Sequence, residues 1–176
     1  MNGQVPTVKI DGLRRVDDAL TAVEAGADVV GLVFVPDRER RVSVRQARRT
    51  VDAVKAISKN PSRVVGLFAD QALEEVRTTV RDSGVDMAQL SGAESLDYCD
   101  EAPVSVFKTI HVPGEHLSDD EIEEMGQRMK ALRERGRLVT LDRAVAGLQG
   151  DTGQTFDWGW RPDCQRKASS SCWLGG

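Results

Sequence analysis

Residues Gly26–Phe34 read GADVVGLVF, a glycine followed by a near-continuous apolar run. Apolar residues at helical spacing precede them over 16–23, so the glycine lies where a helix ends. The run itself is typical of a strand buried on both faces, as in a parallel sheet. The order helix, glycine, strand recurs at Gly84–Ala88 (GVDMA) and at Gly136–Val139 (GRLV). This repetition predicts a parallel sheet with helices outside it.

The rest of the chain continues the alternation. Hydrophobic spacing predicts further helices, one after Ser43, one over Leu73–Val80, a short turn over Ala93–Tyr98 and one that begins at the capping box of Ser118. The remaining predicted strands are Val8–Ile10, Arg63–Phe68, Val85–Leu90, Pro103–Ile110 and Leu138–Leu141.

Two architectures fit such a repeat, an open doubly wound sheet and a (β/α)8 barrel. The first strand is followed by Asp11–Arg14 (DGLR) and not by a glycine-rich dinucleotide fingerprint, which favours the barrel. A barrel needs at least ~200 residues, about 25 for each βα unit, whereas this chain has 176. We therefore expect an α/β fold, an incomplete (β/α)8 TIM barrel of six to seven units that lacks the eighth strand.

Composition excludes several classes of protein. There are 28 acidic and 24 basic side chains, a formal net charge of −4, and 40% of residues are hydrophobic. Nothing suggests a basic nucleic-acid surface or a membrane-spanning segment. The three cysteines have no metal-binding spacing. We expect a cytoplasmic protein with reduced thiols that binds neither nucleic acid nor membrane.

Two aspartates follow predicted strands, where a barrel places its active site. Asp11 ends the first strand and Asp142 ends the sixth. Two carboxylates that face one cavity can divide the roles of general acid and general base. The alternative is that each aspartate caps the next turn.

Other polar residues in these loops are weaker candidates. Arg40 follows the second strand and offers a guanidinium for a substrate carboxylate, or else belongs to a solvated charged loop. Gly150–Gly153 (GDTG) offers backbone amides to an anion, or else is a plain turn. His111 and His116 are expected to be surface histidines.

Taken together, the motifs resemble those of the phosphoribosylanthranilate isomerase family over Val8–Trp158. The matching stretches are the opening Val8–Arg14, the second strand with the Arg-x-Val-Ser continuation at Arg40–Ser43, Val65–Phe68 with Leu73–Val76, Gln89–Gly92, and Leu141–Asp142 with Gly150–Trp158.

The resemblance implies an Amadori rearrangement in tryptophan biosynthesis, with a small phosphosugar substrate and no cofactor or metal. Asp142 matches the family's general acid, and Arg40 falls on the arginine for the anthranilate carboxylate. Asp11 takes the place of the family's cysteine base. The expected substrate-binding residues are Arg40, Lys9, Gln89, Gly150, Thr152 and Gly153. The resemblance does not give the oligomeric state.

Several positions depart from the family pattern. Ser91 replaces a histidine, Asp151 replaces a glycine and Gln154 replaces a lysine. The carboxylate at Asp11 leaves a second enzyme open, the related histidine-pathway sugar isomerase or a dual-substrate form. A third alternative is an inactive barrel fragment that acts only as a binding piece.

The resemblance stops after Trp158. We expect residues 1–158 to form the partial barrel and residues 159–176 an aberrant tail in place of a helix and the seventh strand. Ser169–Gly176 (SSSCWLGG) can be encoded by codons that spell Val-Leu-Leu-Leu-Ala-Gly-Gly in another frame, which suggests a frame change near Gly159. Open strand edges would then weaken the fold and lower turnover.

Overall fold

A computed structural model of the chain describes residues 7–57, 62–112, 117–143 and 172–174. The chain divides into two compact units. The first unit contains Met1–Gln89 and Ala102–Ser105, and the second contains Leu90–Glu101 and Val106–Gly176.

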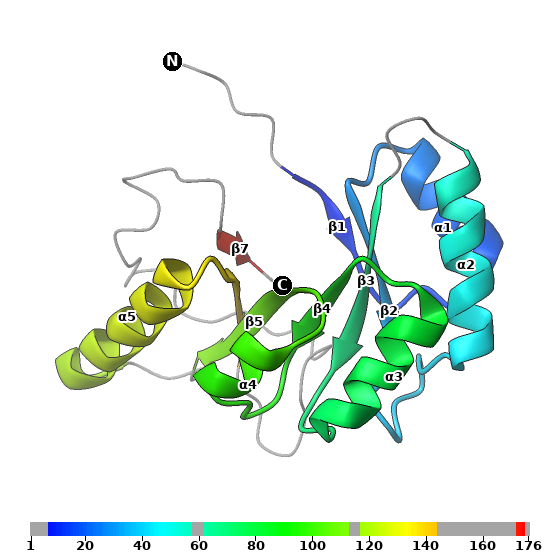
Figure 1. Ribbon diagram of the computed structural model, residues 1–176. Helices are drawn as coiled ribbons and strands as arrows, with labels where there is room; N and C mark the ends of the chain where they lie inside the picture. The colour runs from blue at the N-terminus through cyan, green and yellow to red at the C-terminus, as the bar shows by residue number, and fades with distance from the viewer. Residues whose placement is uncertain (1–6, 58–61, 113–116, 144–171, 175–176) are drawn as a thin grey trace. The chain divides into compact units, whose positions relative to one another are not determined.

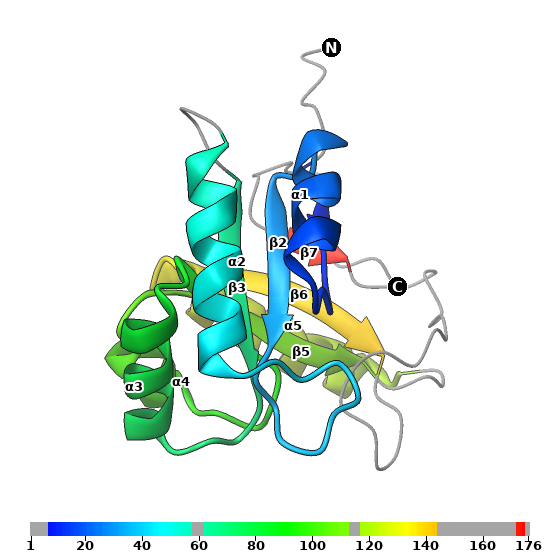
Figure 2. The same cartoon turned by 90° about the vertical axis from the view of Figure 1, so that its right-hand side faces the viewer.

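The first unit alternates strands and helices as predicted. In order these are β1 (Lys9–Ile10), α1 (Val16–Glu24), β2 (Val29–Val33), α2 (Val44–Ala56), β3 (Arg63–Phe68) and α3 (Leu73–Ser83), followed by β4 (Met87–Leu90), whose last residue belongs to the second unit. Strand β2 pairs in parallel with both β1 and β3. The three helices lie along one side of these strands, with α2 between α1 and α3 (Figures 1 and 2).

Local signals place the helix ends of this unit where the sequence predicts them. Ser43 caps α2, because its hydroxyl accepts the N–H of Gln46 while the Gln46 side chain accepts the N–H of Ser43. Gly84 ends α3 in the left-handed conformation, with φ of 74°. The buried face of α2 consists of Ala47, Thr50, Val51 and Val54.

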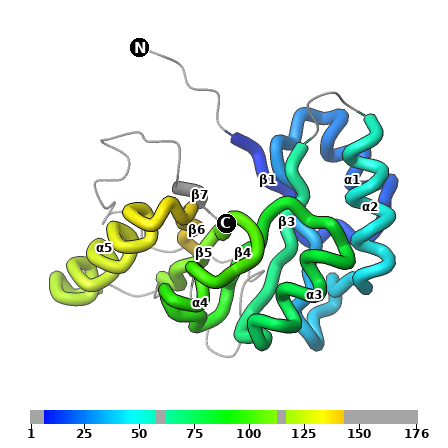
Figure 3. The backbone as a smooth tube through the Cα atoms, viewed as in Figure 1, coloured from blue at the N-terminus to red at the C-terminus, as the bar shows by residue number. Residues whose placement is uncertain are grey.

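The second unit contains α4 (Leu96–Glu101), β5 (Ser105–Val112) apart from its first residue, α5 (Asp119–Glu134), β6 (Leu138–Arg143) and β7 (Cys172–Leu174). Strand β6 pairs in parallel with β5 and with β7. Helix α5 begins at the predicted capping box of Ser118 and packs on β6. The tube in Figure 3 follows this path from α4 to β6.

Two elements of this unit are displaced from their predicted positions. Helix α4 begins at Leu96 and not near Ala93, because the Ser95 hydroxyl accepts the N–H of Tyr98 at 3.1 Å and so caps the first turn. Strand β5 begins at Ser105 and not at Pro103, which has no N–H to give to a strand ladder.

The strand order in the sheet is the chain order, β1 to β7. A doubly wound sheet reverses its strand order at a switch point, whereas the strands of a (β/α)8 barrel follow one another. The order therefore agrees with the predicted barrel topology and excludes the alternative. Within the described residues, no helix combines the length and the apolar character that a bilayer crossing requires.

Part of the predicted tail adds a strand to this order. Residues 159–171 lie outside the described residues. Within the same tail, β7 pairs with β6 in the register Val139↔Cys172, Thr140↔Trp173 and Leu141↔Leu174.

Candidate active site

In the first unit, the end of β1 carries a charged pair. The Lys9 ammonium forms an ion pair and a hydrogen bond with the Asp11 carboxylate. The Lys9 side chain is only 8% exposed, whereas that of Asp11 is 42% exposed. Burial lowers the pKa of Lys9, and the charge and hydrogen bond of Asp11 oppose this shift without cancelling it. The Asp11 carboxylate is thus held by a lysine yet open to a ligand.

A tight turn positions Asp11. Gly12 has φ of 77°, and the N–H groups of Gly12 and Leu13 both donate to the Gly31 carbonyl, at 3.1 and 3.2 Å. A Cβ on Gly31 would lie 1.8 Å from the Asp11 Oδ1. The carboxylate therefore lies directly against the backbone of β2, in space that only a glycine leaves open.

Arg40 joins this cluster from the loop after β2. A Cβ on Gly12 would lie 2.7 Å from the Cδ and 2.9 Å from the Nη1 of Arg40, so the arginine side chain crosses the turn. Three residues predicted separately, Lys9, Asp11 and Arg40, are thus brought together. The arrangement offers a carboxylate for proton transfer and a guanidinium that can bind an anionic group.

The other predicted residues fall elsewhere. Gln89 lies in β4 with its side chain buried, also in the first unit. Gly150, Thr152 and Gly153 lie outside the described residues. Asp142 belongs to the second unit.

Asp142 lies near the end of β6 and is half-buried. It is the register partner of His111 on β5, as Thr140 is of Thr109. Side chains two residues apart on a strand point to the same face, and register partners in neighbouring strands share that face. His111, Thr109, Thr140 and Asp142 therefore share one face of the β5–β6 pair.

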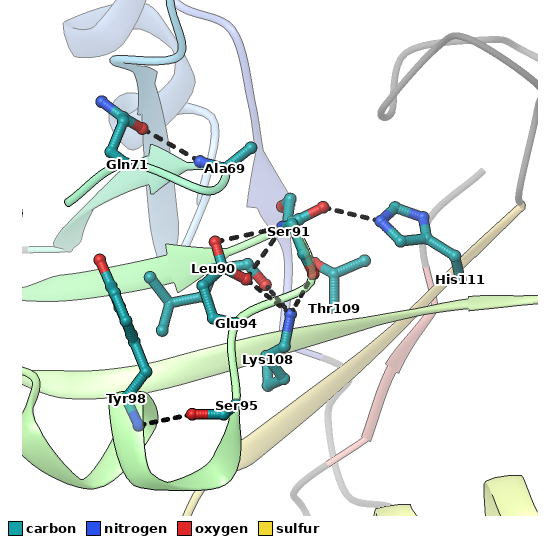
Figure 4. Close-up of polar contacts among 11 residues, drawn as sticks. Ala69, Gln71, Leu90, Ser91, Glu94, Ser95, Tyr98, Lys108, Thr109 and His111 are labelled. Carbon is teal, nitrogen blue, oxygen red and sulfur yellow. Dashed lines mark hydrogen bonds and ion pairs between the residues drawn. The ribbon is translucent and has the colours of Figure 1, made fainter. Parts of the chain in front are cut away.

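The expectation that His111 is a surface residue is wrong. The side chain is half-buried, with its Nε2 2.7 Å from the Ser91 carbonyl oxygen (Figure 4). Because a carbonyl only accepts, Nε2 carries the proton and donates it. The Ser91 hydroxyl also contacts the Thr109 hydroxyl, at 3.1 Å. The sequence does not reveal this contact because no partner lies at ligand spacing, and the actual partner is a backbone carbonyl in the segment that follows β4. His116 lies outside the described residues.

Two further polar residues of the second unit were not predicted. The ammonium of Lys108 lies 2.8 Å from the Glu94 carboxylate, and these side chains are only 1% and 2% exposed. The signal that could have found them is a lysine within the otherwise apolar strand SVFKTIHV, since an isolated charge at such a position needs a partner.

Comparisons with known proteins match this chain to one family. A sequence model described as N-(5'phosphoribosyl)anthranilate (PRA) isomerase matches residues 8–176. A protein of Dehalococcoides mccartyi named N-(5'-phosphoribosyl)anthranilate isomerase is 37% identical over 150 residues, 85% of this chain and 67% of that protein.

Solved structures agree. The crystal structure of phosphoribosyl anthranilate isomerase from Thermotoga maritima matches with a TM-score of 0.68 and 29% identity, over 88% of this chain and 69% of the other. Another structure of this enzyme, in complex with reduced 1-(o-carboxyphenylamino)-1-deoxyribulose 5-phosphate, matches with a TM-score of 0.64 and 28% identity, over 80% of this chain and 66% of the other. The chain spans about two thirds of these relatives, and the predicted incomplete (β/α)8 barrel is confirmed as its fold class.

Proposed function

Because this chain belongs to the N-(5'-phosphoribosyl)anthranilate isomerase family, we propose that it converts N-(5-phosphoribosyl)anthranilate to 1-(2-carboxyphenylamino)-1-deoxyribulose 5-phosphate. The observation that carries the proposal is the cluster at the end of β1, where Asp11 and Arg40 meet around Gly12. The relatives compared above bear the name of the anthranilate substrate, which favours this reaction over the histidine-pathway alternative.

The reaction needs one acid and one base. The acid protonates the ribose ring oxygen, the C1–O bond breaks, and the nitrogen lone pair forms the C=N bond of a Schiff base. The base then removes the proton from C2, and the electrons of that bond neutralise the iminium as an enolamine. A proton then adds to C1 while the C2 hydroxyl loses its proton, which gives the ketone. Apart from the C1–O cleavage that the nitrogen lone pair drives, the steps are proton transfers, so one general acid and one general base are sufficient.

We assign the base to Asp11 and the acid to Asp142. Asp11 is partly exposed at the carboxyl end of a barrel strand, and its carboxylate can accept a proton. Asp142 lies near the end of β6, beside His111 in the sheet register. Arg40, which crosses the turn after Asp11, is assigned to the anthranilate carboxylate as a bidentate donor.

The test measures formation of the ketone product by the purified 176-residue chain and by the variants Asp11→Asn and Asp142→Asn. Each variant keeps the size of the side chain but loses the proton-transfer group, so kcat is expected to fall by about 10²-fold or more. Asp17→Asn is the matched control, because Asp17 is an exposed residue of α1. The proposal fails if the unmodified chain forms no product, and the assignment fails for either aspartate whose variant keeps the original kcat.

A further inference from the structure

The ion pair between Lys108 and Glu94 lies within the second unit and includes neither of the carboxylates assigned to proton transfer. Lys108 is in the middle of β5, and its ammonium donates to the Glu94 carboxylate at 2.8 Å. It also donates to the carbonyl oxygens of Gly92, at 2.6 Å, and Leu90, at 3.1 Å (Figure 4). All three hydrogens of the ammonium thus have acceptors, as burial of a charge demands.

These contacts hold the backbone that follows β4. The carbonyls of Leu90 and Gly92 accept from Lys108, and the carbonyl of Ser91 between them accepts from His111. The N–H of Gly92 donates to the Glu94 carboxylate at 3.0 Å. Three consecutive carbonyls are therefore bound by side chains of one neighbouring strand, which restricts the conformations open to this segment.

The stability of the fold does not explain such a pair. Taking two charges out of water costs more than their attraction returns in many proteins, and uncharged replacements of similar volume are often as stable. Selection of one backbone conformation explains a buried ion pair better than a gain in stability does.

The segment Leu90–Gly92 contacts the face of the β5–β6 pair that carries Asp142. The Ser91 hydroxyl contacts Thr109, and the Ser91 carbonyl holds His111, the register partner of Asp142. On the same face the Thr140 hydroxyl, in a side chain only 9% exposed, has no hydrogen-bond partner within the described part of the chain. A buried hydroxyl of this kind favours a ligand or water at that face.

We propose that Lys108 and Glu94 are positioning residues for the isomerase reaction. They hold the segment Leu90–Gly92 so that the Ser91 carbonyl keeps His111 in place beside Asp142. This inference rests on the function proposed above.

The test uses the double variant Lys108→Met/Glu94→Gln in the full chain. Lys108→Met alone removes the ammonium that balances the charge of the buried Glu94 carboxylate, so its melting temperature is expected to fall sharply. The double variant removes both charges, and the amide of the new glutamine can still accept the N–H of Gly92. We expect it to recover most of the melting temperature yet to show a kcat at least 10-fold below the unmodified chain, with KM changed less.

A second readout does not depend on turnover. Amide hydrogen exchange at Ser91 and Gly92 is expected to accelerate at least 10-fold in the double variant. The matched control is Lys130→Met/Glu134→Gln, which removes an exposed ion pair of α5 whose side chains are 77% and 65% exposed. It should leave kcat and exchange unchanged.

Two results would overturn the inference, a double variant with unchanged kcat or one with unchanged exchange at Ser91 and Gly92. If exchange accelerates while no form of the chain turns over substrate, the proposed function is overturned and the role of the pair in holding the segment stands.

Discussion

At the scale of single residues, the turn after β1 brings together two residues to which we assign roles in the reaction, Asp11 and Arg40. Asp11 and Arg40 are 29 positions apart and were each predicted from their place after a strand. Their proximity depends on Gly12, whose φ of 77° lets the chain turn beneath the arginine, and on Gly31, which leaves room for the carboxylate. A pattern of residue types does not contain such a contact, because it arises from the register of β1 against β2.

Gly31→Ala tests the position of Asp11. The new Cβ would lie 1.8 Å from the carboxylate oxygen, so the carboxylate has to move. A catalytic group displaced by about 1 Å can cost about 10²-fold in rate. We expect kcat to fall by about this factor, measured by steady-state kinetics.

The control for this variant is a measurement of its free energy of unfolding, which shows whether the fold is retained. The Asp11 side chain is partly exposed and can move toward solvent, but the new Cβ would also lie 3.0 Å from the Cδ1 of Leu67, so the chain should unfold as one folded species with a loss of about 1–3 kcal/mol in the free energy of unfolding. A variant with unchanged kcat would show that Asp11 does not need this position.

Lys9→Met tests the cost of the buried ammonium. Burial lowers the pKa of Lys9 below 10.5, so the folded chain binds this proton less tightly than the unfolded chain does. Charged Lys9 therefore costs stability at neutral pH, and the cost is relieved as pH rises through the folded pKa toward 10.5. We expect Lys9→Met to be more stable than the unmodified chain at pH 7, with the difference shrinking as pH rises.

Urea unfolding at pH 7 and near pH 10.5 measures this difference. An unmodified chain that is the more stable of the two at pH 7, or a gap that is the same at both pH values, would contradict the expectation.

At the scale of elements, the capping boxes and terminal glycines decide where helices begin and end. These are local signals, since the hydrogen bonds join residues three or four positions apart. This is why the start of α2 after Ser43 and the end of α3 at Gly84 were predicted correctly. The start of α4 was missed because the serine that caps it, Ser95, lies inside the range predicted as helical.

Ser118→Ala tests the cap of α5. The Ser118 hydroxyl accepts the N–H of Glu121, and the Glu121 carboxylate accepts the N–H and hydroxyl of Ser118. Loss of such a cap costs about 1 kcal/mol. The bonds from Ser118 lower the pKa of Glu121, so its contribution is present above the unfolded value of 4.5 and is lost as pH falls through the folded pKa.

The expected result is a destabilised variant at pH 7 whose deficit is smaller at pH 3, measured by denaturant unfolding. Gly126→Ala in the same helix is a control that is expected to change stability in the opposite direction. Nothing lies within 4 Å of its new Cβ, so it should stabilise the chain by about 0.5–1 kcal/mol. An equal deficit for Ser118→Ala at both pH values would exclude Glu121 from the cap.

At the scale of the whole molecule, the strand order and the tail are the main features. The chain-order sheet agrees with the barrel predicted from the βα repeat. For residues 159–176 we propose a change of reading frame near Gly159. This is supported by the apolar strand that the other frame permits for Ser169–Gly176.

The gene sequence beyond the codon for Trp158 tests this proposal. We expect the codons of Ser169–Gly176 to spell Val-Leu-Leu-Leu-Ala-Gly-Gly in the shifted frame. A protein made from the restored frame should show higher turnover and higher soluble yield than the 176-residue chain, because an apolar strand completes more of the sheet. Codons that spell no such strand would end the proposal.

The sequence by itself determined the helices and most of the strands, the parallel βα order, the family, and the places of Asp11 and Asp142 at the ends of strands. All of these follow from hydrophobic spacing, caps and motifs, which act between residues close along the chain. Only the tertiary structure decided that Arg40 crosses the turn of Gly12, that His111 donates to Ser91, and that Lys108 and Glu94 are buried together. Those contacts join residues 14 to 28 positions apart, and the alignment of neighbouring strands and of the loops that follow them sets such contacts.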